Sequence, residues 1–206
     1  DGLVLLESLR DLPREETQGS CTGGEWNKDY VWFTRDEAAG FVPSDPMRGT
    51  SHQVPARLVE RLATCHFIDN GRNLTEPFGP EDMEVAELTS TVEACDGSVV
   101  HIRLEGRTRV SKSGVWPVNG EVDNDSPSGQ VRGVEVEILG RATYNLSTQE
   151  FDSFEMVAIG TRWGGTQWND RTNDLAGGPI GFAFRIADRR PIDRMAPYAM
   201  SWGSYW

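Results

Sequence analysis

The chain has 206 residues and a formal net charge of −12, from 32 acidic and 20 basic residues. Binding to nucleic acid or to an anionic membrane requires a basic surface, and the sequence contains no uninterrupted basic cluster, so neither partner is expected. No apolar run approaches the roughly 18 residues of a membrane span, which argues against membrane insertion.

The first fifty residues are irregular apart from two short apolar segments. Leu3–Leu9 ("LVLLESL") and Asp29–Arg35 ("DYVWFTR") are expected to be strands. The first residue is Asp1 and not Met, so we expect either that a leader was removed or that the chain is part of a larger protein.

One segment has the pattern of an amphipathic helix. "VPARLVERLATCHFID" starts with a proline near its first turn, and Leu58, Leu62 and Cys65 fall on one apolar stripe. Gly71 and the polar residues around it end the pattern. The sequence therefore predicts one main helix at about residues 55–68.

The rest of the chain alternates between apolar and polar residues, as antiparallel strands with one buried face do. Asp96-Gly97 is a strong hairpin signal between two of these segments. The expected strands are 83–95, 98–110, 131–145, 151–163 and 179–187. Glycines at equivalent points of two strands, Gly106 and Gly140, suggest bends. We predict a mainly β (α+β) fold, an antiparallel β-sandwich or a strongly curved sheet with one main helix.

We find no linker, so residues 1–206 are expected to form a single β-rich domain. Its N-terminal segment (1–50) and C-terminal tail (188–206) would be irregular. Segments 111–130 and 164–178 are expected to be loops because they are rich in Gly, Asn, Pro or Trp.

The end of the predicted helix carries the first candidate site. His66 lies on the flank of the apolar stripe, followed by Asp69 and Asn70. One interpretation makes His66 and Asp69 transition-metal ligands, or His66 a ligand or base oriented by Asp69, with Asn70 binding a ligand. The other makes His66 a buried core residue and has Asp69 and Asn70 bond to the backbone. No spacing brings His52 or His101 to it.

Two kinds of loop residue could also bind ligands. Asp123 and Asp125 offer the oxygen ligands that calcium prefers, although they match no EF-hand, and a solvated turn is the alternative. Trp163 and Trp168 flank one loop and could stack on a glycan or anchor a protein partner, or they could cover the core.

The chain has three cysteines and no Cys-x-x-Cys motif, so a zinc ribbon is not indicated. Cys21 and Cys95 lie in turn-like surroundings and form the most plausible disulfide, which a secreted context would favour. Cys65 faces the core and is expected to be unreactive.

Four stretches, "VPSDP", "VPARLVERLATCHFIDN", "VEVEILGRATYN…FDSFEMVAIGTRWG" and "PIGFAFRIADRRPIDR", resemble uncharacterised bacterial β-rich domains. The resemblance covers roughly residues 40–195. It implies an extracytoplasmic protein, secreted or periplasmic, and some of these domains stand beside thioredoxin-like domains. The family carries no known activity, although "HFIDN" matches its helix-end motif.

These observations favour a non-catalytic extracytoplasmic module that binds a protein or a glycan, or an accessory domain that packs against another part of a longer chain. No Gly-x-Ser-x-Gly, His-Glu-x-x-His or Walker motif is present. The alternative is a metal-binding protein or an enzyme with a site around His66, Asp69 and Asn70. No cofactor is expected under the first hypothesis, whereas the second calls for a transition metal and the acidic loops for calcium.

Overall fold

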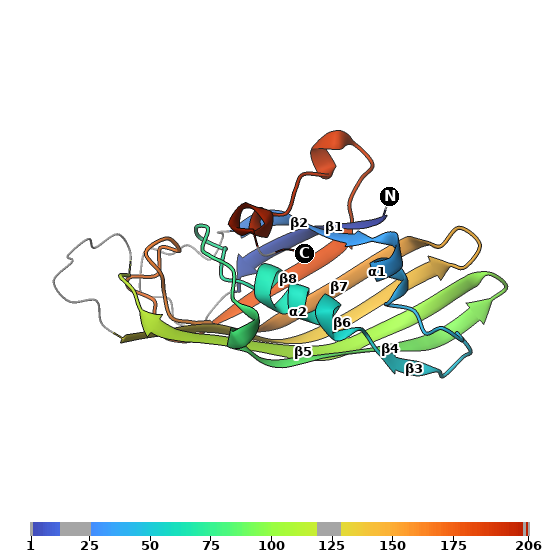
Figure 1. Cartoon of the computed structure of the whole chain (residues 1–206), viewed down its shortest axis with the longest axis horizontal. Coiled ribbons are helices and arrows are strands. Elements are labelled where there is room, and N and C mark those ends of the chain that lie inside the picture. Colours follow the sequence, from blue (N-terminus) through green and yellow to red (C-terminus); the bar gives the residue numbers. More distant parts are fainter. Residues whose placement is uncertain (1, 13–25, 119–128, 204, 206) are drawn as a thin grey trace.

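The computed structural model describes residues 2–12, 26–118, 129–203 and 205. They form one eight-stranded antiparallel sheet with the order β2-β1-β8-β7-β6-β5-β4-β3 (Figure 1). The strands are β1 (Gly2–Asp11), β2 (Trp26–Thr34), β3 (Ser51–Gln53), β4 (Met83–Asp96), β5 (Val99–Val115), β6 (Gly129–Asn145), β7 (Glu150–Trp163) and β8 (Gly178–Ile186). The prediction of a mainly β antiparallel fold is thus confirmed.

The prediction of a sandwich or a strongly curved sheet is wrong, because the described strands form a single sheet that is neither closed nor strongly curled. Helices, not a second sheet, lie over its apolar face: α1 (Arg35–Ala39) and α2 (Ala56–Arg61), which continues as the π-helical turn η1 (Leu62–His66) (Figure 1). Alternation along a strand shows that one face is buried, but it does not show what covers that face.

The predicted faces of the long strands are confirmed. Along β5, Val100, Ile102, Leu104 and Val110 are each at most 1% exposed, and alternate residues such as Arg103 and Glu105 point away from the core. The hairpin between β4 and β5 turns directly after Asp96, where Gly97 adopts a left-handed φ of +63°.

Two segments expected to be irregular contain regular structure. Residues 111–115 extend β5 and pair with residues 129–133 at the start of β6, although they lack the apolar alternation of the rest of the strand. The tail contains two 3₁₀ turns, η3 (Pro191–Asp193) and η4 (Tyr198–Trp202), and a third, η2 (Pro80–Asp82), precedes β4. Gly106 marks a close backbone approach, since a Cβ atom there would lie 2.1 Å from the Glu87 carbonyl oxygen.

The main helix spans 11 residues, from Ala56 to His66, which confirms the predicted helix. Leu58 and Leu62 are completely buried. Arg61 extends from the same helix to Glu37 of α1, with a closest nitrogen–oxygen distance of 2.7 Å. These contacts fix the helix over the sheet. No helix within the described ranges is long and apolar enough to span a membrane.

Candidate metal centre

Three metal-ligating side chains meet where the main helix ends above the β1–β2 hydrogen-bonded pair. Glu7 of β1 and Asp29 of β2 are directly opposite each other in the antiparallel register, and both point to the helix-covered face. His66, the last residue of η1, lies above them. One ligand atom from each residue lies within 4.8 Å of the other two. Local strand pairing and a helix end thus create a cluster from segments far apart in sequence.

The helix delivers His66 through an unusual last turn. The amide of Phe67 donates to the Leu62 carbonyl oxygen at 2.8 Å, an i to i+5 bond, and all residues from Leu62 to His66 are buried. A π turn inserts one extra residue and so rotates the side chains that follow, and such turns are frequent at functional sites. Here the rotation directs the imidazole at the two carboxylates.

Both imidazole nitrogens of His66 have a partner. Nδ1 lies 2.9 Å from Glu7 Oε2 and 3.8 Å from Asp29 Oδ2, and Nε2 lies 3.1 Å from the Tyr205 hydroxyl. That hydroxyl accepts the backbone N–H of Trp32 at 2.8 Å and lies 3.4 Å from the Trp32 carbonyl oxygen. Protons can therefore be arranged in two consistent ways, one with the His66 proton on Nδ1 and one with it on Nε2.

Burial dominates the electrostatics of the cluster. It raises the pKa of the Glu7 carboxyl well above its usual range. Burial, followed by repulsion from Glu7, raises the pKa of Asp29 to about 6, against the attraction of His66. Burial lowers the pKa of His66 to about 4. At neutral pH the imidazole is therefore uncharged and does not neutralise the carboxylates beside it.

The two carboxylates differ in how they are satisfied. Asp29 Oδ1 accepts the backbone N–H of Tyr30 at 2.8 Å and that of Tyr198 at 3.0 Å. Glu7 is 1% exposed, and its Oε1 atom has no hydrogen-bond partner among the described residues. A buried carboxylate oxygen without a partner is costly, so this atom calls for a donor or a cation.

The donor set suits a transition metal ion. Imidazole nitrogen and carboxylate oxygen together are ligands for zinc, iron or manganese, whereas calcium takes oxygen ligands. Two ligands bound tetrahedrally at about 2.0–2.2 Å lie roughly 3.3–3.6 Å apart. The distances from His66 Nδ1 to Glu7 and Asp29, 2.9 and 3.8 Å, bracket that separation. Small movements of the side chains would be enough to bind an ion.

The structure does not bring Asp69 to His66, so the expected orienting role of Asp69 is wrong. The Asp69 carboxylate instead binds the guanidinium of Arg171, with a shortest distance of 2.5 Å. The backbone causes this, because Phe67 leaves the helix at φ −77° and ψ 62°. Asn70 has a structural role as well, since its Oδ1 accepts the Thr75 N–H at 2.7 Å. This agrees with the helix-end alternative.

The other predicted ligand residues stay predictions. Trp163 packs under the guanidinium of Arg109, 5.0 Å from its ring centroid, and Trp168 is 51% exposed. Asp123 and Asp125, the expected calcium ligands, lie outside the described residues, as does Cys21. The Cys21–Cys95 disulfide is therefore untested, although Cys95 is exposed and so open to a partner. Cys65 is buried, and burial raises the pKa of its thiol, as an unreactive cysteine requires.

Sequence reasoning identified His66 but missed Glu7 and Asp29. A signal was present in the alternation. Glu7 occupies the same strand face as Leu5 and Leu9, and Asp29 the same face as Val31. A carboxylate on the apolar face of a strand must be paired, protonated or bound to a metal.

Comparisons with known proteins found no matching family model, no similar curated protein and no similar solved structure. The resemblance to extracytoplasmic bacterial domains therefore stays a prediction, and the site itself must support any functional conclusion.

Proposed function

We propose that this protein is a metal-binding module in which Glu7, Asp29 and His66 hold one divalent transition metal ion. In this state His66 binds the ion through Nδ1, and its Nε2–H donates to the Tyr205 hydroxyl. That hydroxyl would then donate to the Trp32 carbonyl oxygen, 3.4 Å away. A hydrogen bond from the second imidazole nitrogen is the usual way to orient a metal-bound histidine.

One observation carries the proposal, namely that Glu7 is a buried carboxylate with no cationic side chain paired to it among the residues that the structure describes. Four acidic residues of the described chain are buried. Three of them form an ion pair with an arginine: Glu37 binds Arg61, and both Asp11 and Asp69 bind Arg171. Within the described part of the chain, Glu7 pairs only with the imidazole, and its second oxygen has no partner. A metal ion would supply the missing positive charge and bind the carboxylate.

The burial of the ligands favours a structural metal. The side chains of Glu7 and His66 are at most 1% exposed, and that of Asp29 is 15% exposed. Tyr205 lies against the imidazole ring, with 5.6 Å between the ring centroids. A catalytic metal must reach a substrate, whereas a structural one is enclosed by protein. The ion would join β1, β2 and the helix end, and so stabilise the fold.

We propose that this metal-stabilised module works outside the cytoplasm as a non-catalytic binding or accessory domain. The sequence resemblance and the tryptophans of the 163–168 loop support this part, with a protein or a glycan as the partner. Fractionation of the source cells would check the location, because a protein recovered only with the cytoplasm would contradict it.

Elemental analysis of the purified, untagged protein after dialysis without chelator tests the metal. We expect about one transition metal ion per chain, and loss of that metal in Glu7→Gln and His66→Gln. Glu37→Gln is a matched control because it alters a buried carboxylate outside the cluster, and it should keep its metal. The proposal fails if the wild type holds no metal and if zinc, manganese and ferrous ions each leave its melting temperature unchanged.

A further inference from the structure

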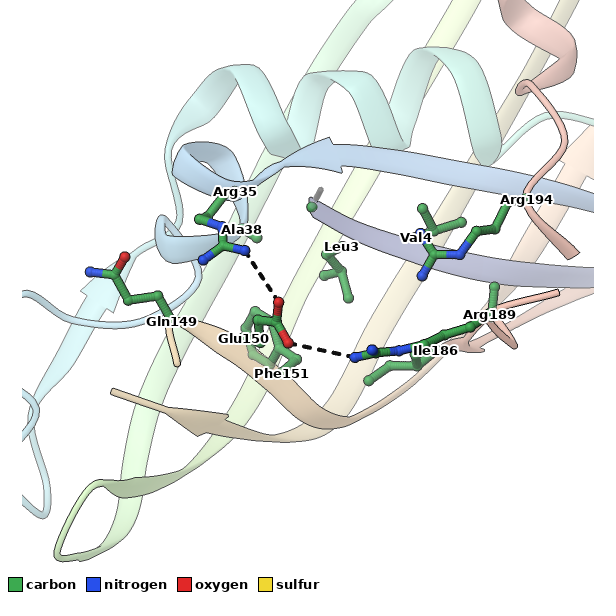
Figure 2. Close-up of a pocket in the computed structure, with 12 residues that line it drawn as sticks. Leu3, Val4, Arg35, Ala38, Gln149, Glu150, Phe151, Ile186, Arg189 and Arg194 are labelled. Atoms are coloured by element: carbon green, nitrogen blue, oxygen red, sulfur yellow. Dashed lines mark hydrogen bonds and ion pairs between the residues drawn. The ribbon is translucent and has the colours of Figure 1, made fainter. Parts of the chain in front are cut away.

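A second candidate site lies at the N-terminal end of β1. There β8 is shorter than its two neighbouring strands, β1 and β7, and so leaves a notch in the sheet. β8 ends at Ile186, which pairs with Leu5, so residues 2–4 of β1 have no β8 partner. Residues 150–154 of β7 likewise extend beyond β8, whose pairing with β7 starts at Glu155. The chain turns away at Ala187, whose N–H still donates to the Val4 carbonyl oxygen. A pocket of about 390 Å³ lies at this notch (Figure 2).

The wall of the pocket between the strands is apolar. Leu3 and Val4 of β1, Phe151 of β7 and Ile186 of β8 contribute to it, and Ala38 of α1 lies at one side (Figure 2). The volume lies within the range of sites for small organic ligands, roughly 300–1,000 Å³. An apolar group of a ligand could be buried here.

The rim of the pocket is positively charged, although the chain as a whole carries −12. Arg35, Arg189 and Arg194 line it, and among the described lining residues Glu150 is the single acidic one (Figure 2). Glu150 pairs with Arg35 at 3.2 Å and with Arg189 at 3.6 Å. Two of the three guanidinium groups thus share one carboxylate, and Arg194 does not pair with it.

Arg194 differs from the other two arginines. Its side chain is partly buried, and it forms no hydrogen bond or ion pair with any residue in the described part of the chain. An Arg guanidinium presents a planar set of donors that matches a carboxylate. Arg194 lines the same pocket as the apolar residues, so it can receive an anionic group whose apolar part rests on the apolar wall.

We propose that this pocket binds an organic carboxylate with an apolar body. The apolar wall would hold the body, and Arg194 would bind the carboxylate, helped by the positive charge of Arg35 and Arg189. Glu150 competes for the same arginines, so it limits the affinity. This site shares no residue with the metal centre, and its ligand would bind whether or not a metal is bound.

The experiment is isothermal titration calorimetry of the whole chain with decanoate, with decan-1-ol as the uncharged analogue and acetate as the carboxylate without an apolar body. We expect binding of decanoate and at least tenfold weaker binding of both analogues, because each lacks one half of the recognised chemistry. Equal binding of decanol would overturn the role of the arginines, and no binding of decanoate would overturn the proposal.

Two substitutions with opposite expected effects sharpen the test. Arg194→Gln should weaken decanoate binding about tenfold, since it removes a charge-assisted hydrogen bond. Glu150→Gln should strengthen binding, because it removes the competing carboxylate. Arg190→Gln is the control, since Arg190 is in the same segment but outside the pocket, where it binds Asp193 at 2.6 Å. If Arg190→Gln weakens binding as much as Arg194→Gln, only general surface charge is involved and the site is refuted.

Discussion

Replacing Glu7 with glutamine should affect stability differently with and without a metal ion. The substitution keeps the shape of a side chain that is 1% exposed, and it removes a carboxyl group that pairs with no arginine in the described part of the chain. In chelator, the loss of one charge-assisted hydrogen bond to His66 is offset by the loss of the desolvation penalty of the carboxylate. We expect the free energy of unfolding to stay within about 1 kcal/mol of the wild type or to rise.

When metal is added, the free energies of unfolding of the wild type and of Glu7→Gln should differ. A ligand that binds only the folded chain stabilises it by about 4 kcal/mol when the ligand concentration is a thousand times the Kd. The wild type should gain this amount on addition of zinc, manganese or ferrous ion, whichever it binds, and Glu7→Gln should gain little. Urea unfolding followed by tryptophan fluorescence measures both quantities, because the chain contains seven tryptophans.

The matched comparison is Glu37→Gln, which breaks the buried pair with Arg61 and should cost about 3 kcal/mol both in chelator and in metal. If Glu7→Gln behaves like Glu37→Gln, with equal losses in both conditions, Glu7 has only a structural hydrogen-bonding role. The reasoning about an unbalanced carboxylate would then be wrong.

Three further predictions concern the rest of the fold. Leu62→Ala should lower the free energy of unfolding by roughly 2–4 kcal/mol, since Leu62 is completely buried, and a loss near zero in urea would contradict the helix packing. Tyr205→Phe should cost about 1–3 kcal/mol, because it leaves the Trp32 N–H without its acceptor, and an unchanged urea midpoint would exclude that contribution. Asp11→Asn should cost about 3 kcal/mol at pH 7, because Asp11 binds the buried Arg171. Burial by itself would raise the pKa of Asp11, but the hydrogen bonds and charge of Arg171 outweigh it and lower the pKa below its usual range. The stabilising contribution is present above the ordinary pKa of aspartate, about 4, and is lost as the pH falls through the lower folded-state pKa, so the difference between Asp11→Asn and the wild type should shrink as the pH is lowered below about 4. A constant difference over that range would show that the ionised carboxylate contributes nothing.

Much of the fold could be predicted from the sequence because strand alternation and helix periodicity are local. The parity of Val100, Ile102 and Leu104 identified the buried face of β5, and the spacing of Leu58 and Leu62 identified the helix. What covers the sheet is not local. The helix packs where a sandwich would have had a second sheet, and no pattern within a strand distinguishes the two arrangements.

The candidate site was harder to predict, for a related reason. His66 was recognised as unusual, but its partner was sought three residues away, at Asp69, on the assumption that the chain continues regularly. The π turn and the exit at Phe67 direct Asp69 to Arg171 instead. The acidic residues that do meet His66 come from β1 and β2, which pair at one side of the sheet. Only the pairing of those strands places Glu7 beside it.

The distribution of buried charge explains why this cluster differs from the others of the molecule. On the covered face, polar side chains gather along β1, where Glu7 and Asp11 stand in line with Leu5 and Leu9. Arg171 donates hydrogen bonds to both Asp11 and Asp69, so its positive charge lies between the two carboxylates. Four residues earlier on the same strand, Glu7 lies beside the neutral imidazole of His66 and the carboxylate of Asp29. Among the described residues, an arginine pairs with the first carboxylate, Asp11, and none pairs with Glu7. An ion held by the three side chains would give both positions the same balance, and for this reason we expect the metal to stabilise the fold.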